Sequence, residues 1–265
     1  MALVDLLMLA SEWLAVVFLG AWLWQLRTGN AGMVDPLWAL SLGALAPLYA
    51  ALADGAPSAR LLVGIGGGLW GARLGLYLWR RNAGKPEDAR YRKLREDWGD
   101  STQGKMLGLF LLQGVISLAL SVAFLFPCLR EQSPGTVAVL AFIAIWLIAV
   151  VGESVADSQL RLFASQPGNR GEVCRVGLWH FSRHPNYFFE CLHWVAYVPL
   201  ALGVPWGWLT ALAPVLMAGL LWYVSGIPLL EAHLLATRPG YADYMRTTSV
   251  LIPWPPRQSS QERNT

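Results

Sequence analysis

The sequence predicts an all-α, polytopic membrane protein with seven transmembrane helices, and three observations support this fold class. Hydrophobic residues make up 55% of the 265 residues and charged residues only 14%, whereas soluble domains carry about 45–50% and about 25%. The chain contains 14 Trp, and indole rings gather where an apolar interior meets a wet interface. Seven segments are also apolar over the roughly 20 residues that a helix needs to cross a bilayer.

The predicted spans follow one another with short turns between most of them. We place them at residues 3–26, 36–53, 60–79, 106–127, 135–152, 187–204 and 208–230. The turns contain Gly, Pro, Asn and Asp, the residue types that end helices and form tight turns. Only two connections are long and polar, at 80–105 and 153–186. We therefore expect a single seven-helix domain over residues 1–256 and a polar tail at 257–265.

Positive charge is distributed unequally between the two sides of this predicted topology. Of the 20 Lys and Arg residues, only Arg60 and Arg130 fall in the loops of one side and Arg73 lies inside a span, while the others share the opposite side. Cytoplasmic loops of membrane proteins carry an excess of Lys and Arg. The distribution predicts an outside N-terminus, a cytoplasmic C-terminus and a multi-pass protein of a bacterial inner membrane. Both long polar segments would then face the cytoplasm, where a charged cofactor enters.

Composition and spacing argue against several kinds of site. The three cysteines form no CxxC pair, so we expect neither a disulfide framework nor a zinc knuckle. His180 and His184 have the i, i+4 spacing of metal ligands, but Pro185 follows them and no carboxylate stands at the spacing of a hydrolytic site. We therefore expect no metal. No basic run interleaved with aromatics suggests nucleic acid, and we expect a monomer in contact with membrane lipid.

The densest polar stretch starts at the end of the fifth predicted span. Glu153, Asp157 and Arg161 are spaced by four residues, which places them on one face of a continuing helix. A solvated helix end with an Asp157–Arg161 ion pair is the simpler interpretation. Because ionisable groups at membrane depth are costly and usually functional, their position favours a binding site.

A second polar face begins the sixth predicted span. Pro185 suits the first turn of a helix, because its fixed φ matches the helix and its missing N–H has no partner there. Asn186, Glu190 and His193 then share one face. Such residues can be satisfied packing groups, but a stripe of polar side chains inside lipid needs a reason, and we interpret it as a binding site.

Three further features each have two interpretations. Arg73 and Tyr77 lie four residues apart in the third span, and Arg73 can either snorkel toward the headgroups or bind a phosphate or a carbonyl inside the bundle. The charged segment 87–95 is either an interfacial amphipathic helix on anionic lipid or a cover over a ligand. Asp35 precedes Pro36, so it is either a helix N-cap or a neutral carboxyl that donates to a ketone.

At these polar residues the chain resembles the steroid 5α-reductase family, especially its bacterial members. The matching motifs are Glu153-x3-Asp157, Gly177-Leu178-Trp179, Asn186-Tyr187-Phe188-x-Glu190, His233 and the ending from Tyr244 to Leu251-Ile252-Pro253. The resemblance is strong over about residues 153–254 and weaker before them. It implies a seven-helix membrane reductase of lipid and steroid metabolism that binds NADPH in the cytoplasmic half of its bundle. Such an enzyme transfers hydride to the β-carbon of a Δ4-3-oxosteroid.

The resemblance also implies roles for individual residues. The implied cofactor contacts are Arg73, Tyr77, Glu153, Asp157, Arg161, Arg170, Arg175, Ser182, Asn186, Tyr187, Glu190 and His233. The arginines among them suit the diphosphate or the ribose 2′-phosphate. The catalytic candidates are Asp35, Tyr77 and Glu190, since a donor at the carbonyl oxygen stabilises the charge that hydride attack creates. The chain departs from the family in the substrate half, where Trp70 stands at an expected Tyr and the early Gln-Glu pair is not evident.

We expect an NADPH-dependent oxidoreductase that acts on the C=C bond of a hydrophobic enone, either a 3-oxosteroid or an isoprenoid-like lipid. Two alternatives stay open. The Arg183-His184-Pro185-x-Tyr187 element is similar to the tails of S-adenosylmethionine-dependent isoprenylcysteine carboxyl methyltransferases. A non-catalytic lipid-binding membrane protein would bind neither nucleotide, and the intramembrane polar stripes speak against it.

Overall fold

The computed structural model describes residues 1–224 and 226–257. This part of the chain is helical and contains no β-strand, which confirms the all-α part of the predicted fold class. The expected tail at 257–265 lies outside the described residues except for Arg257. The chain divides into two compact units, Met1–Ala138 with Tyr197–Ala213 and Val139–Ala196 with Pro214–Thr265. The expectation of a single domain stays a prediction.

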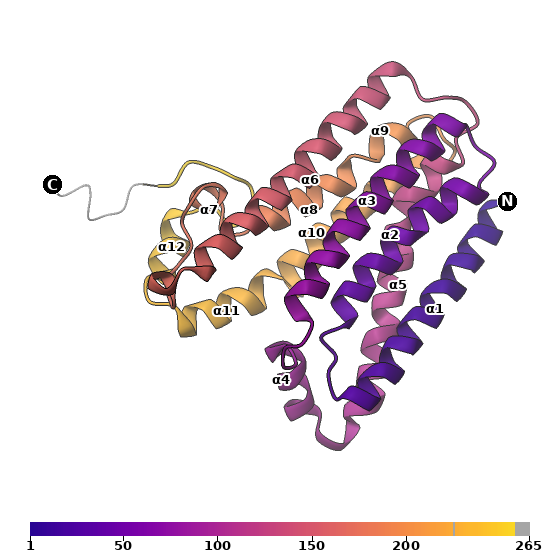
Figure 1. Cartoon of the computed structure of the whole chain (residues 1–265). Coiled ribbons are helices and arrows are strands. Elements are labelled where there is room, and N and C mark those ends of the chain that lie inside the picture. Colours follow the sequence, from indigo (N-terminus) through magenta and orange to yellow (C-terminus); the bar gives the residue numbers. More distant parts are fainter. Residues whose placement is uncertain (225, 258–265) are drawn as a thin grey trace. The chain divides into compact units, whose positions relative to one another are not determined.

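The first unit is built on four long helices, α1, α2, α3 and α5, that run beside one another (Figure 1). Its α-helices are α1 (Leu3–Thr28), α2 (Val34–Leu52), α3 (Pro57–Asn82), α4 (Ala89–Trp98), α5 (Thr102–Cys128) and α9 (Val198–Ala201). Short 3-10 turns form η1 (Gly99–Ser101) and η3 (Gly207–Ala211). The first four predicted spans correspond to the four long helices.

Glycines allow α2 and α3 to pack closely. A Cβ at Gly71 would lie 2.5 Å from the Cα of Gly43, so only the absence of a side chain lets the two backbones approach this far. Three aromatic rings fill the interior of the same unit. Phe124 lies between Trp70 and Tyr197, with ring centroids 6.5 and 4.9 Å away. All three side chains are completely buried.

The charged helix predicted around residues 87–95 is present as α4. Asp88 is its N-cap, and its Oδ1 accepts hydrogen bonds from the Arg90 backbone N–H at 2.9 Å and from Arg90 Nε at 3.0 Å. A capping carboxylate satisfies amide donors of the first helical turn that have no partner within the helix. The sequence-based expectation of a helix at this place is therefore met.

Asp35 lies inside the first turn of α2 and is not its N-cap. The helix begins at Val34 with Met33 as the N-cap residue, so the N-cap interpretation of Asp35 is wrong. Its carboxylate instead accepts hydrogen bonds from Arg90 Nη2 at 2.8 Å and from Tyr91 Oη at 2.9 Å. These contacts suit a charged carboxylate and tie α4 to the start of α2.

The second unit contains one long helix and several short ones. They are α6 (Thr136–Ser165), η2 (Pro167–Asn169), α7 (Leu178–Phe181), α8 (Pro185–Val195), α10 (Leu212–Gly219), η4 (Leu220–Val224), α11 (Ile227–Thr237) and α12 (Tyr241–Thr247). η4 is a turn of π-helix. α6 continues well past the predicted end of the fifth span, so the expectation that its polar row lies on a continuing helix is confirmed.

The C-terminal segment of the second unit is attached to the loop before α8. The Arg183 backbone N–H donates to Ser249 O at 2.8 Å. Ser182 Oγ donates to Leu251 O at 2.8 Å, and Ser182 and Ser249 form an isolated parallel bridge. The start of α8 is therefore held by residues that follow α12.

Within the described residues, six helical segments are long and apolar enough to cross a membrane. They are Leu3–Thr28, Val34–Leu52, Pro57–Asn82, Ala89–Cys128, Thr136–Ser165 and Gly207–Thr237. Large apolar side chains project from them without cover, and Val16 and Val137 are 69% and 82% exposed. Such faces suit contact with lipid, and the six segments indicate a multi-pass membrane protein.

The predicted span at 187–204 does not form one long helix. α8 ends at Val195, and α9 covers only Val198–Ala201. Pro199 gives the physical reason, because proline has no N–H to donate to the carbonyl four residues before it, at the end of α8. Helix length alone therefore does not confirm the predicted count of seven spans.

Candidate functional site

One face of α6 carries two buried carboxylates. Glu153 and Asp157 are each 4% exposed, and they lie one helical turn apart. Arg161, one turn further, is exposed, and its Nη2 lies 3.5 Å from Ser158 Oγ. The predicted row of acid, acid and base is present, and it changes from buried to exposed along the helix.

The Gly177-Leu178-Trp179 motif packs against the same helix. Gly177 has a φ of 57°, and a Cβ there would lie 2.2 Å from Gln159 Nε2, so both its backbone and its surroundings require glycine. The Leu178 N–H donates to Gln159 Oε1 at 2.9 Å. Trp179 Nε1 donates to Ala156 O at 2.9 Å. The motif therefore anchors the loop before α8 on α6.

α8 brings its polar face to α6. Asn186 Nδ2 donates to Asp157 Oδ1 at 3.3 Å. Phe189 packs so closely on α6 that a Cβ at Gly152 would lie 2.4 Å from its ring. Pro185 occupies the first turn of α8, as its chemistry predicts. The two polar faces that the sequence places on separate helices therefore meet in one cluster.

The remaining polar groups of this face of α8 are buried as well. Glu190 is 6% exposed and His193 is completely buried. Trp194 Nε1 donates to Glu190 Oε1 at 3.0 Å. The cluster thus combines carboxylates, an amide and an imidazole, which together can accept hydrogen bonds from hydroxyl and amide donors and can donate to a carbonyl.

A buried ion pair that the sequence analysis did not assign lies beside the start of α8. Arg183 Nε donates to Glu231 Oε1 at 2.7 Å, and His184 Nε2 lies 3.0 Å from the same oxygen. Arg183 Nη1 also donates to Met245 O and Thr248 O, at 2.9 and 2.8 Å. The available signal was the position of Glu231 after a long apolar run, because a buried carboxylate requires a cationic partner.

Ser182 and Tyr187, both expected as cofactor contacts, pack around the start of α8. Ser182 is completely buried and donates to the C-terminal segment. The ring of Tyr187 stacks on that of His184, with centroids 5.3 Å apart and an interplanar angle of 8°. Both side chains stabilise the turn from which Asn186 projects.

The expected phosphate contacts of this unit lie at its exposed surface. Arg161 and Arg170 are exposed. Arg175 Nη2 lies 3.4 Å from Asp243 Oδ2, so a carboxylate already accompanies this guanidinium. His233 is exposed on α11. Arg161 and Arg170 are therefore more accessible to an anion than Arg175 is.

The other expected site residues belong to the first unit. Arg73 and Tyr77 lie one turn apart on α3, and both are half-buried. Asp35 faces the guanidiniums of Arg90 and Arg81, with nitrogen to oxygen distances of 2.8 and 3.9 Å. Arg73 and Tyr77 thus share a helix face, whereas Asp35 is part of the contact between α2 and α4.

Comparison with known proteins gives one result. Residues 21–248 match the model of a family described as "Protein of unknown function (DUF1295)", and this range covers most of both compact units. No curated protein and no solved structure matches the chain.

Proposed function

We propose that this chain, which belongs to the DUF1295 family, is an NADPH-dependent membrane oxidoreductase that acts on the C=C bond of a hydrophobic enone. The family is associated with steroid 5α-reductase-like proteins, in agreement with the motif resemblance. The Δ4 bond of a 3-oxosteroid is the first substrate class that we infer, and an isoprenoid-like enone is the second. The observation that carries the proposal is the contact of Asn186 with Asp157, which joins two buried polar faces.

The burial of this cluster favours a ligand with several hydrogen-bond donors. Glu153, Asp157 and Glu190 are all nearly inaccessible to solvent. Keeping like charges in one buried cluster costs electrostatic free energy, and hydrogen bonds from a ligand would offset part of that cost. Glu190 suits an acceptor better than a proton donor, because Trp194 Nε1 already donates to it.

The donor and acceptor groups of the cluster fit the nicotinamide and ribose part of NADPH. Ribose hydroxyls and a carboxamide N–H can donate to carboxylates, and the amide of Asn186 can both donate and accept. The phosphates suit the exposed guanidiniums of Arg161 and Arg170. Arg175 fits less well, since a carboxylate accompanies it. When bound, NADPH supplies the hydride.

Tyr77 is the residue to which we assign hydrogen-bond donation to the substrate carbonyl. Its phenol is half-buried and shares a face of α3 with Arg73. An O–H donor at this oxygen stabilises the negative charge that develops during reduction. Asp35 fits the role poorly, because it accepts hydrogen bonds from Arg90 and Tyr91 and would have to be neutral to donate.

Contacts within the second unit support seven crossings. Arg175, in the loop after α6, lies 3.4 Å from Asp243, which follows α11. Arg238 Nη1 likewise donates to Glu172 O at 2.8 Å. Loops in contact lie on one side of a membrane, so if Gly207–Thr237 is a span, these contacts support a crossing by residues 185–206 as well. With an odd number of crossings and the observed charge distribution, we infer a cytoplasmic C-terminus in a bacterial inner membrane.

The Arg183-His184-Pro185-x-Tyr187 element, which is similar to one in methyltransferases, has a structural role that requires no methyl donor. Arg183 and His184 both contact Glu231. Tyr187 stacks on His184. The side chains of this element therefore stabilise the start of α8. Their presence does not favour S-adenosylmethionine over NADPH as the ligand.

Nucleotide binding to the purified protein tests the proposal. We expect NADPH to bind the detergent-solubilised chain, and Asn186→Ala to raise the Kd about tenfold, because a lost hydrogen bond of this kind costs about 1.4 kcal/mol. Asn169→Ala is the matched control, since Asn169 lies in the exposed turn η2 and donates to Phe163 O at 3.0 Å. Calorimetric titration measures both values.

Each result of this experiment has a definite meaning. Equal Kd values for the two variants would contradict the assigned site. Stabilisation by S-adenosylmethionine but not by NADPH would favour a methyltransferase, and binding of neither would favour a non-catalytic lipid-binding protein. If NADPH binds, testosterone-like and progesterone-like enones are the first substrates to supply, and mass spectrometry should show a product that has gained two hydrogens.

A further inference from the structure

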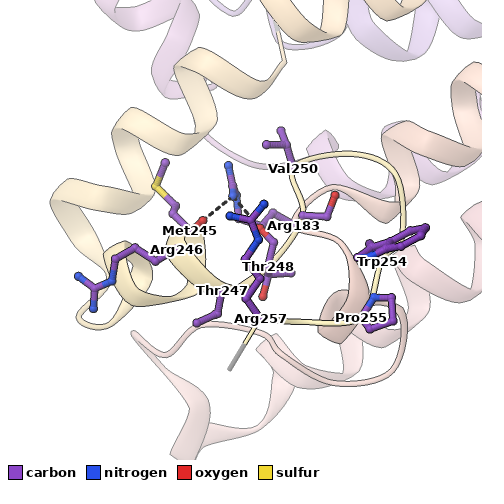
Figure 2. Close-up of a pocket in the computed structure, with 10 residues that line it drawn as sticks. Arg183, Met245, Arg246, Thr247, Thr248, Val250, Trp254, Pro255 and Arg257 are labelled. Carbon is purple, nitrogen blue, oxygen red and sulfur yellow. Dashed lines mark hydrogen bonds between the residues drawn. The ribbon is translucent and has the colours of Figure 1, made fainter. Parts of the chain in front are cut away.

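A pocket of about 370 Å³ lies between the loop before α8, the end of α12 and the C-terminal segment (Figure 2). It belongs to the second unit and is formed by residues outside the six apolar segments. Its polar lining consists of Arg183, Arg246, Arg257, Thr247, Thr248 and Ser249. Among the described residues that line it, none is Asp or Glu. This lining is suited to an anion.

The lining arginines differ in their orientation. Arg183 is 7% exposed, and its Nη1 is fixed by hydrogen bonds that include one to Met245 O at 2.9 Å. Figure 2 shows the Arg257 side chain extending toward the middle of the lining residues, whereas the Arg246 side chain points away from them. Arg246 Nη2 also lies 2.9 Å from Asp243 Oδ1. Arg257 is therefore the cation that the pocket can best offer to a ligand.

Positive charge exceeds negative charge around the pocket. Glu231 pairs with Arg183 at 2.7 Å and offsets its charge. Asp243 lies within 3.4 Å of Arg175 and 2.9 Å of Arg246, so one carboxylate serves two guanidiniums. No ion pair of Arg257 offsets this excess among the residues that the structure describes.

We propose that this pocket binds a phosphate group, either of a phosphodiester or of a free phosphate anion, with Arg257 as the principal cationic contact. A guanidinium suits phosphate because it can donate two parallel hydrogen bonds to it. The hydroxyls of Thr248 and Ser249 on the pocket wall are further hydrogen-bond donors. The lining residues differ from those of the Asn186–Asp157 cluster, so the proposal is independent of the nucleotide site.

The surroundings of the pocket favour a phospholipid headgroup as the source of this phosphate. Trp254 lines the pocket and is 69% exposed, and Ile252 nearby in sequence is 63% exposed. Exposed indole and aliphatic side chains of this kind gather at the membrane–water interface. A basic residue near an anionic membrane surface is attracted to it. The lining segment also follows closely on the last apolar span, Gly207–Thr237.

Two probes distinguish the possible sources of the phosphate. The full chain is titrated with inorganic phosphate in detergent, and it is reconstituted in phosphatidylcholine nanodiscs with increasing phosphatidylglycerol. We expect phosphatidylglycerol to raise the midpoint of thermal unfolding, and Arg257→Gln to weaken this response about tenfold in lipid concentration. Arg246→Gln removes the same charge from a side chain that points away, and it should keep the response of the wild type.

Each outcome either supports or overturns the proposed phosphate pocket. A response to phosphatidylglycerol alone assigns a lipid headgroup, and a response to inorganic phosphate that Arg257→Gln weakens assigns a free phosphate as well. No response to either probe, or an equal loss in both variants, would overturn the proposal. Loss of the fold does not obscure the result, because the Arg257 backbone N–H that donates to Thr247 O at 2.8 Å is retained in Arg257→Gln.

Discussion

Glu231 holds two basic side chains at the start of α8. Its Oε1 lies 2.7 Å from Arg183 Nε and 3.0 Å from His184 Nε2, and all three residues are buried. A buried charge without its partner keeps the full cost of its lost hydration. Because Asn186 follows directly in the first turn of α8, the geometry of the polar cluster depends on this ion pair.

Glu231→Ala should therefore lower the free energy of unfolding by about 3–5 kcal/mol, the usual cost of removing one member of a buried pair. Asp243→Ala serves as the matched control. Asp243 is 41% exposed and also pairs with two arginines, but an exposed pair is worth only about 0–1 kcal/mol. Denaturant unfolding in detergent measures both values, and similar losses would show that burial does not strengthen the Glu231 contacts.

For single residues, the sequence predicts which side chains share a helix face, but not which side chains of other elements they contact. The spacing of Glu153 and Asp157, and of Asn186 and Glu190, follows helical periodicity, so their alignment could be read directly. Arg183 and Glu231 are 48 positions apart, and their meeting depends on how α11 packs. No local pattern contains that information.

The helices are more predictable from the sequence than these contacts, except near Pro199, where α8 ends at Val195. Long apolar runs and the charged run of α4 identify helices through their composition and periodicity. The apolar character of residues 187–204 predicts one span, whereas Pro199 has no amide N–H with which to continue α8. The six segments that fit by length and composition therefore leave out this stretch, which the proposed seven-span topology includes.

The stability that the Asp88 N-cap gives to the start of α4 should depend on pH, and this dependence can be tested. Burial acts to raise the pKa of Asp88, but hydrogen bonds from the Arg90 side chain and backbone outweigh it and keep the pKa below its usual range. A carboxyl with a lowered pKa contributes stability above its unfolded pKa of about 3.9, and this contribution is lost as the pH falls through the folded value.

At neutral pH, Asp88→Ala should accelerate amide hydrogen exchange in α4 about fivefold, because losing an N-cap costs about 1 kcal/mol. Asp88→Asn keeps the capping oxygen and should exchange faster than the wild type only to the extent that the charge matters. Lowering the pH below the folded pKa should remove the difference between the wild type and Asp88→Asn. A difference that persists there would contradict the assigned cause.

At the scale of the whole molecule, the number of crossings decides the location of the termini. Six crossings would place both ends of the chain on one side, and seven would place them on opposite sides. The contact of Arg175 with Asp243 favours seven, as does the distribution of basic residues. Hydropathy predicts seven crossings and charge asymmetry is the strongest support for that number, whereas six helical segments of the described residues meet the criteria of length and composition.

Cysteine accessibility in intact cells measures this topology. In a variant without the native cysteines, Ala2→Cys should react with a membrane-impermeant maleimide, because the N-terminus is expected outside. Trp254→Cys, at a position 69% exposed in the fold, should react only after the membrane is opened. Labelling of both positions in intact cells would require an even number of crossings and would refute the proposed orientation.

The attachment of Ser182 and Arg183 to Leu251 and Ser249 has a consequence for biogenesis. These anchoring residues leave the ribosome long after α8 has been synthesised. A nascent chain can thus insert its apolar segments before the residues that form hydrogen bonds with the start of α8 have been synthesised. The polar cluster can therefore reach its final geometry only after Ser249 and Leu251 have been synthesised.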